Sequence, residues 1–171
     1  MRSRRLVIGL LLCTAAAVLV SALRMRPPGY TRIHVVAEGA GKPLFSAVVP
    51  DGERLTLLWR NSQFGLDVTE EFFTRSGILV QDRAAFAVPG GAPPPRVAAR
   101  DVADLFHTGG PFDARGLSRP LTRVVYRIGE IGNPKLRVQN RTIAFKEEAG
   151  FGGRVVLTAE RPSLFEILLH F

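Results

Sequence analysis

Three polar side chains, those of Asn61, Ser62 and Glu70, offer the clearest chemistry in the sequence. Asn61 and Ser62 follow the predicted strand 54–60, and Glu70 lies in the next predicted strand, 68–74. If these strands pair, Asn61 and Glu70 approach one another across the end of a hairpin. They would then form a polar site for a ligand or for the backbone of a partner. In the alternative, Asn61 and Ser62 cap a turn and Glu70 accepts hydrogen bonds from its backbone NH groups.

The common catalytic and metal-binding patterns are missing from the sequence. It contains no Gly-x-Ser-x-Gly and no His-x-x-x-His, and the glycines of residues 150–153 lack the lysine of a P-loop. Asp101, Asp104 and His107 are spaced three apart, so they drift around a helix rather than converge on an ion. We therefore expect a non-enzymatic protein with no catalytic residues, no metal and no cofactor. An enzyme with an unrecognised site at the three polar residues above is the alternative.

An apolar segment near the N-terminus is predicted to cross a membrane. Residues 6–23 are apolar apart from two small hydroxyl residues, and as a helix they span roughly 27 Å, enough for a bilayer core. Arg2, Arg4 and Arg5 precede this segment. By the positive-inside rule they place the N-terminus in the cytoplasm and the rest of the chain outside it.

The division of the chain follows from this segment. We expect residues 1–26 to be a single-pass anchor in the inner membrane and residues 27–171 to be one domain in the periplasm. Small residues precede Ala22, after which a signal peptidase could cut, so secretion to the periplasm after cleavage is the alternative. Cys13 is the only cysteine and lies in the apolar segment, so the exported domain has no disulfide framework.

The basic character of the chain does not indicate nucleic-acid binding. Five of its 23 Lys and Arg residues flank the apolar segment, and no acidic residue lies before Glu38. The other 18 basic residues are therefore balanced in residues 27–171 by all 15 acidic ones. This domain has no basic cluster with interleaved aromatic residues. A mild excess of positive charge is typical of a solvated surface, and we expect no nucleic-acid partner.

Short strand-like runs with turn residues between them predict a mainly β domain. They cover residues 33–37, 44–49, 54–60, 68–74, 78–81, 84–88, 122–128, 135–138, 142–146, 154–158 and 164–171. Strands at this spacing favour an antiparallel β-sandwich or an open barrel. Residues 96–107 form the one good helix candidate of the domain, because four apolar side chains there share a face.

Proline and glycine make the segment between strand 84–88 and this helix irregular. A proline-rich loop loses little entropy on docking, so we predict that it contacts a partner protein. The residues of this proline-rich loop are Pro89, Gly90, Gly91, Pro93, Pro94 and Pro95.

Three short motifs follow one another between residues 55 and 95. Trp59-Arg60-Asn61-Ser62 ends one strand, Glu70 lies in the next, and a glycine-rich segment, residues 86–91, follows. In this order the motifs resemble those of a bacterial family, domain of unknown function 1850, and the similarity extends over residues 33–160. The family carries a histidine where this chain has Asn61. A role that needs a titratable imidazole is therefore lost here, whereas a hydrogen-bonding role can survive.

The resemblance implies a connection with solute transport. Members of the family resemble accessory proteins encoded beside TRAP-type transporters of the TAXI class, which use a periplasmic substrate receptor. The chain is thus predicted to be an extracytoplasmic accessory or binding module with an envelope or transporter protein as its partner. The further alternative is an envelope scaffold that serves as a spacer. A buried Glu70 beside a cleft would favour an enzyme, whereas an exposed apolar patch near the proline-rich loop would favour a protein partner.

Overall fold

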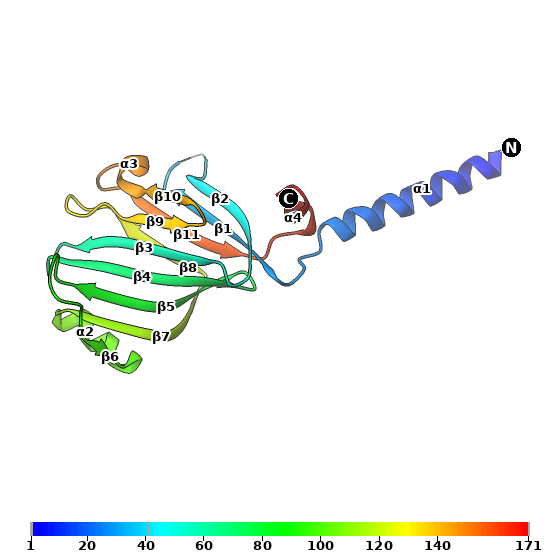
Figure 1. Cartoon of the computed structure of the whole chain (residues 1–171). Helices are drawn as coiled ribbons and strands as arrows, with labels where there is room; N and C mark the ends of the chain where they lie inside the picture. The colour runs from blue at the N-terminus through cyan, green and yellow to red at the C-terminus, as the bar shows by residue number, and fades with distance from the viewer. Residues whose placement is uncertain (1, 41, 171) are drawn as a thin grey trace.

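The computed structural model describes residues 2–40 and 42–170, with side chains from residue 13 onward. It contains a mainly β domain and an N-terminal helix, α1 (Arg2–Leu23), that extends away from it (Figure 1). The four-stranded sheet has the order β2 (Phe45–Pro50), β1 (Tyr30–Ala37), β11 (Arg154–Glu160) and β8 (Arg123–Arg127). The seven-stranded sheet has the order β10 (Arg141–Ala144), β9 (Lys135–Val138), β3 (Arg54–Asn61), β4 (Leu66–Arg75), β5 (Ile78–Ala87), β7 (Phe112–Leu121) and β6 (Arg96–Val97).

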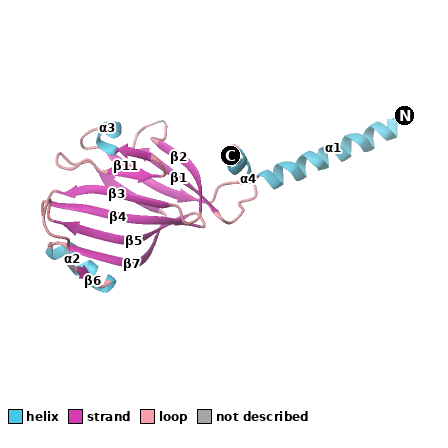
Figure 2. Cartoon of the chain, viewed as in Figure 1, coloured by secondary structure: helices cyan, strands magenta, loops and turns pink. Residues whose placement is uncertain are grey.

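The mainly β prediction is confirmed, since strands dominate the domain (Figure 2). Among the described strands, every pair is antiparallel except β6 with β7. In β1, buried and half-buried residues alternate, as expected of a strand with one face in a core. Ile33 and Val35 of β1 belong to one buried cluster with Leu55 and Leu57 of β3 and Phe72 of β4. This shared core holds the two sheets together, because each such side chain contributes about 1.5–3 kcal/mol on burial.

A second, smaller cluster lies where α2 (Val102–Thr108) packs on the seven-stranded sheet. Val102 and Leu105 of this helix contact a cluster that contains Phe86 of β5 and Phe112 of β7. Trp59 packs against both clusters. It therefore marks the seam between the part of the large sheet that the small sheet covers and the part that α2 covers.

A β-bulge at Asp82 decides which side chains of β5 reach the inner face. Between β4 and β5, Glu71 pairs with Arg83 whereas Phe72 pairs with Gln81, which leaves Asp82 as the extra residue. The pairing of β5 with β7 is irregular at the same place. Simple alternation would have turned Asp82 inward, but the bulge instead places Gln81 on the inner face.

The C-terminal segment corrects one prediction. Residues 164–171 were expected to be a strand, but the structure forms helix α4 (Leu164–Leu168) there. Ser163 and Glu166 form a capping box, in which the serine side chain accepts from the Glu166 NH and the glutamate side chain accepts from the Ser163 NH. This pairing satisfies NH groups at the start of the helix and so favours helix over strand.

Other predicted elements are also corrected. Strand β7 was not predicted, because its glycine, serine and proline residues are typical of turns. The helix expected over 96–107 divides into β6, a short 3-10 helix (Ala99–Asp101) and α2. Of the strand expected over 142–146, the second part is helix α3 (Phe145–Ala149). The predicted strands 78–81 and 84–88 are one strand, interrupted in register by the bulge.

Helix α1 covers the predicted membrane anchor. Up to residue 12 only its backbone is described, so the first half of the apolar segment 6–23 lies outside the described side chains. None of the helices that the described residues form is both long enough and apolar enough to cross a membrane. The anchor stays a prediction.

Candidate functional site

The carboxylate of Glu70 accepts three hydrogen bonds between the two sheets. The Trp59 Nε1–H and the Tyr126 hydroxyl both donate to Oε2, each at 3.0 Å, and the Gln81 Nε2–H donates to Oε1 at 2.8 Å. We call these four residues the Glu70 network. Tyr126 comes from β8 of the small sheet, whereas the other three residues come from β3, β4 and β5 of the large sheet. The network therefore links the two sheets by polar contacts inside the domain.

Burial raises the pKa values of two groups in this network, Glu70 and Tyr126. Burial raises the pKa of Glu70 above its ordinary value of 4.5, and the hydrogen bonds from Trp59, Tyr126 and Gln81 and the charge of Arg119 oppose this rise without cancelling it. Burial, followed by the charge of Glu70 and the hydrogen bond to it, raises the pKa of Tyr126 above its ordinary value of 10.0. Tyr126 therefore stays protonated and remains a hydrogen-bond donor to Glu70.

The Glu70 network fixes the orientation of Trp59. Its indole NH is held by Glu70, and its ring meets Phe86 edge to face with centroids 6.1 Å apart. The hydrogen bond and the edge-to-face ring contact together restrict the orientation of the Trp59 side chain. Glu70 thus acts as a positioning residue for Trp59.

Asn61 and Glu70 do not meet, so the predicted cluster of Asn61, Ser62 and Glu70 is wrong as a set of mutual contacts. In the β3–β4 register Asn61 lies opposite Leu66, four residues before Glu70. Asn61 Oδ1 accepts hydrogen bonds from the NH groups of Gln63 (2.9 Å) and Phe64 (3.0 Å). This is the turn-capping arrangement that the alternative predicted for Asn61. The same alternative is wrong for Glu70, whose partners are side chains and not backbone groups.

Asn61 and Ser62 instead line a hollow of about 210 Å³ that Trp59 also borders. We call it the Trp59 pocket. Arg127 at the end of β8 and Ile131 in the loop that follows β8 contribute to its other walls. Trp59 connects the two halves of the predicted cluster, since it borders the pocket and donates its indole NH to Glu70. Glu70 itself is not among the residues that line this pocket.

The loop between β8 and β9 closes the pocket against β3. Gly132 in this loop has a φ of +93°, and a Cβ at this position would lie 2.9 Å from the carbonyl oxygen of Arg60. Glycine is therefore required for this close approach. The loop is fastened to α3, because Asn133 Oδ1 accepts from the Lys146 NH at 3.0 Å and Lys146 Nζ donates to the Glu130 carbonyl at 2.9 Å.

The lining of the Trp59 pocket contains arginine and hydroxyl groups but no carboxylate. The Arg60 side chain already has partners: its Nη2 donates to the Gly65 carbonyl at 3.3 Å, and its Nε lies 3.9 Å from the Asp67 carboxylate. Arg127 has no ion pair, and the Ser62 hydroxyl has no hydrogen bond, among the described residues. An arginine and a serine without side-chain partners in the described part of the chain thus line the pocket together with Trp59, and guanidinium and hydroxyl groups are suited to bind a carboxylate or another anionic group.

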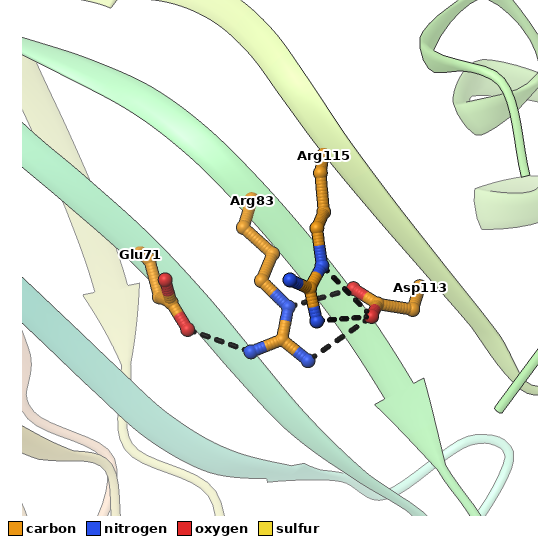
Figure 3. A network of polar contacts seen from close by, with 4 residues as sticks. All are labelled: Glu71, Arg83, Asp113 and Arg115. Carbon is orange, nitrogen blue, oxygen red and sulfur yellow. Dashed lines mark hydrogen bonds and ion pairs between the residues drawn. The ribbon is translucent and has the colours of Figure 1, made fainter. Parts of the chain in front are cut away.

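A second charged network lies on the outer face of the large sheet (Figure 3). Arg83 forms two hydrogen bonds with Asp113, from Nε at 2.6 Å and from Nη2 at 3.2 Å, and its Nη1 donates to Glu71 at 2.6 Å. Arg115 also donates to Asp113, at 3.1 and 3.2 Å. We call these four residues the outer ion-pair network. Glu71, which pairs with Arg83 in this network, has a side chain that is 29% exposed.

The proline-rich loop lies at the same end of the domain as the Trp59 pocket. Strands β3 and β5 are both antiparallel to β4, so the segments that follow them leave the sheet on one side, away from α1 (Figure 1). All residues of the loop are exposed except Pro94, which is half-buried, and Val88 at its base is 49% exposed. This end of the domain thus presents both a polar hollow and an exposed proline-rich loop.

Comparisons of the chain with protein-family models, with curated proteins and with solved structures gave no match. The resemblance to the domain of unknown function 1850 family therefore stays a prediction from its motifs. Among the described residues, no group of three or more His, Cys, Asp or Glu side chains is placed to hold a metal ion.

Tyr126, Gln81 and Arg127 were not predicted as site residues. Alternation along β8 places Val124 and Tyr126 on its inner side, and this signal could have identified the tyrosine. Gln81 reaches the inner face only through the bulge, and Arg127 borders the pocket only because the two sheets pack against each other. Neither position follows from the spacing of residues in the sequence.

Proposed function

We propose that the chain is a non-enzymatic binding module whose Trp59 pocket receives an anionic group. The observation that carries this proposal is that Arg127 and Ser62 both line a hollow without acidic residues in its lining. Neither side chain has a hydrogen-bond or ion-pair partner among the described residues. Trp59, held in place by Glu70, offers a fixed aromatic wall to the ligand. A carboxylate on such a site gains charge-assisted hydrogen bonds and contact with the ring.

We further propose that the anionic group belongs to a solute or to an envelope protein handled by a TRAP-type transporter of the TAXI class. The motif resemblance supports the transporter connection, and the position of the pocket supports access by a partner. The pocket and the proline-rich loop share the end of the domain away from α1. If α1 is the inner-membrane anchor, that end points into the periplasm, where a substrate receptor would approach.

The single tryptophan of the chain makes the pocket directly measurable. Titration of the full chain with succinate or benzoate should change the fluorescence of Trp59, with saturation. Arg127→Gln should weaken this binding about tenfold, because it removes the guanidinium from the site. Arg137→Gln on β9 is the matched control, since Arg137 is exposed and does not line the pocket. Equal affinities of the two variants, or no saturable change in the parent, would contradict the proposal.

The source of the anionic group needs a separate experiment. A photocrosslinker at Ser62 in native membranes should capture an envelope protein if the group belongs to a protein partner. Deletion of the chain should lower solute uptake and leave the solute affinity of the receptor unchanged. Saturable carboxylate binding without any captured protein would assign the pocket to a free solute, whereas normal uptake in the deletion strain would remove the transporter connection.

The enzyme alternative draws on the raised pKa of Glu70. The pKa shift fits an acid catalyst, but the oxygens of Glu70 already accept from three side chains and Glu70 does not line the Trp59 pocket. A catalytic acid must come within hydrogen-bond reach of its substrate. The geometry therefore supports a positioning role for Glu70.

A further inference from the structure

The C-terminal helix α4 turns an apolar face away from the domain. Phe165, Leu168 and Leu169 are 49%, 62% and 71% exposed. Their spacing of three and four residues places them on one side of the helix. Large apolar side chains gathered in this way on a surface mark a contact with a membrane or with another protein.

The domain holds α4 firmly in this orientation. Ile167 is 8% exposed and faces the domain. Glu166 pairs with Arg32 of β1, and His170 Nε2 accepts from the Val48 NH of β2 at 3.1 Å. With the capping box at Ser163, these contacts tie both ends of the helix. The outward apolar face is therefore a built feature of the fold.

The apolar surface continues from α4 onto the end of α1. The Leu164 NH donates to the carbonyl of Met25 at 2.7 Å, and Met25 is 65% exposed. The apolar side chains Val18 and Leu19 of α1 are also exposed, and so are Arg24 and Arg26 beside Met25. Figure 1 shows α4 beside the domain end of α1.

We propose that the apolar face of α4, together with Met25, rests in the interface of a lipid bilayer that contains anionic lipids. Apolar side chains with flanking arginines are the composition of interfacial helices, because the apolar groups enter the acyl boundary and the guanidinium groups meet the headgroups. Continuity with the apolar segment of α1 selects a bilayer as the occupant. The contact is independent of the Trp59 pocket, and it sets that pocket on the side of the domain that faces away from the membrane.

Site-specific fluorescent labels test this contact in the full chain. In a Cys13→Ser background, Leu169→Cys and Phe151→Cys each provide one labelling site, and both positions are 71% exposed. The labelled chains are reconstituted into phosphatidylcholine and phosphatidylglycerol vesicles that carry nitroxide lipids. The label at position 169 should emit at shorter wavelength and be quenched about twofold more than the label at position 151. Equal, water-like emission at both positions would overturn the proposal.

Two further outcomes keep the bilayer distinct from other occupants. A label at position 169 that is shielded from water but not quenched by nitroxide lipids would indicate a second copy of the chain and would also overturn the proposal. In a Leu168→Ser, Leu169→Ser variant, a label at Phe165→Cys should lose about half of its lipid quenching. Because both leucines are exposed, this variant should unfold at the same temperature as its parent, and unchanged quenching in the folded variant would again count against bilayer contact.

Discussion

Glu70 and Glu71 are neighbours on β4, yet they belong to networks on opposite faces of the sheet. Glu70 points inward and accepts from three neutral donors of the Glu70 network. Glu71 points outward and pairs with Arg83 of the outer ion-pair network. Two adjacent glutamates on one strand therefore have different kinds of partner: Glu70 has neutral donors inside the domain, and Glu71 has the partly exposed guanidinium of Arg83.

The two faces shift acidic pKa values in opposite directions. On the inner face burial dominates and raises the pKa of Glu70. On the outer face the hydrogen bonds from Arg83, with those from Arg115, lower the pKa of Asp113 below its ordinary value of 3.8 against the effect of burial. The largest influence therefore differs between the two faces: burial on the Glu70 carboxyl, and hydrogen bonds from the Arg83 guanidinium on the Asp113 carboxyl.

The largest expected effect of a substitution is that of Glu70→Ala. It leaves three donors without their acceptor inside the domain, and we expect a loss of about 3 kcal/mol in the free energy of unfolding. Urea denaturation followed by the fluorescence of Trp59 measures it. Glu70→Gln is the matched control, because its amide oxygen can accept from Trp59 and Tyr126 while Gln81 turns its own amide to accept. A loss under 1 kcal/mol for Glu70→Ala would show that the network contributes little.

Asp113→Ala should have the next largest effect. Asp113 is the shared acceptor of Arg83 and Arg115, and its side chain is only 8% exposed. Its removal should lower the free energy of unfolding by about 2 kcal/mol, less than a fully buried pair because both arginines can reach water. Circular dichroism during denaturation measures the change. A loss larger than that of Glu70→Ala would contradict the prediction that the Glu70 network contributes more to the free energy of unfolding than the outer ion-pair network.

The two networks should respond to pH with opposite sign. The native pKa of Glu70 is raised above 4.5, so its contribution to stability is present below this value and is lost as the pH rises through the native pKa. The native pKa of Asp113 is lowered, so its contribution is present above 3.8 and is lost as the pH falls through the native pKa. The stability of the parent relative to Glu70→Gln should therefore fall as the pH rises above about 4.5. The stability of the parent relative to Asp113→Asn should instead fall below about pH 4.

Glu71→Ala should have the smallest effect. Arg83 keeps its two hydrogen bonds to Asp113 when Glu71 is removed, and both partners are partly exposed. We expect a loss of about 0.5 kcal/mol, which should shrink further at high salt. Binding of carboxylates to the Trp59 pocket should not change in this variant, whereas Glu70→Ala should weaken it by releasing Trp59. Equal effects of both substitutions on binding would contradict the positioning role of Glu70.

The proline-rich loop and most strand positions could be predicted from local sequence. Turn residues such as Pro50 to Gly52 and Gly132 to Pro134 separate apolar runs whose period matches a strand, and these signals act over a few residues. The hairpin of β3 and β4 was predicted in this way, together with the turn-capping alternative for Asn61. The break between residues 81 and 84 was also detected, although it is a bulge within one strand and not a loop.

Tertiary structure decided which polar groups form the site. Gln81 faces Glu70 only because the bulge at Asp82 shifts the register of β5 by one residue. Tyr126 meets Glu70 across two sheets, 56 residues away along the chain. Such contacts depend on how strands pair and how sheets pack, and residue spacing in the sequence contains neither. For the same reason the sequence alone placed Asn61 with Glu70, whereas the folded chain joins them through Trp59.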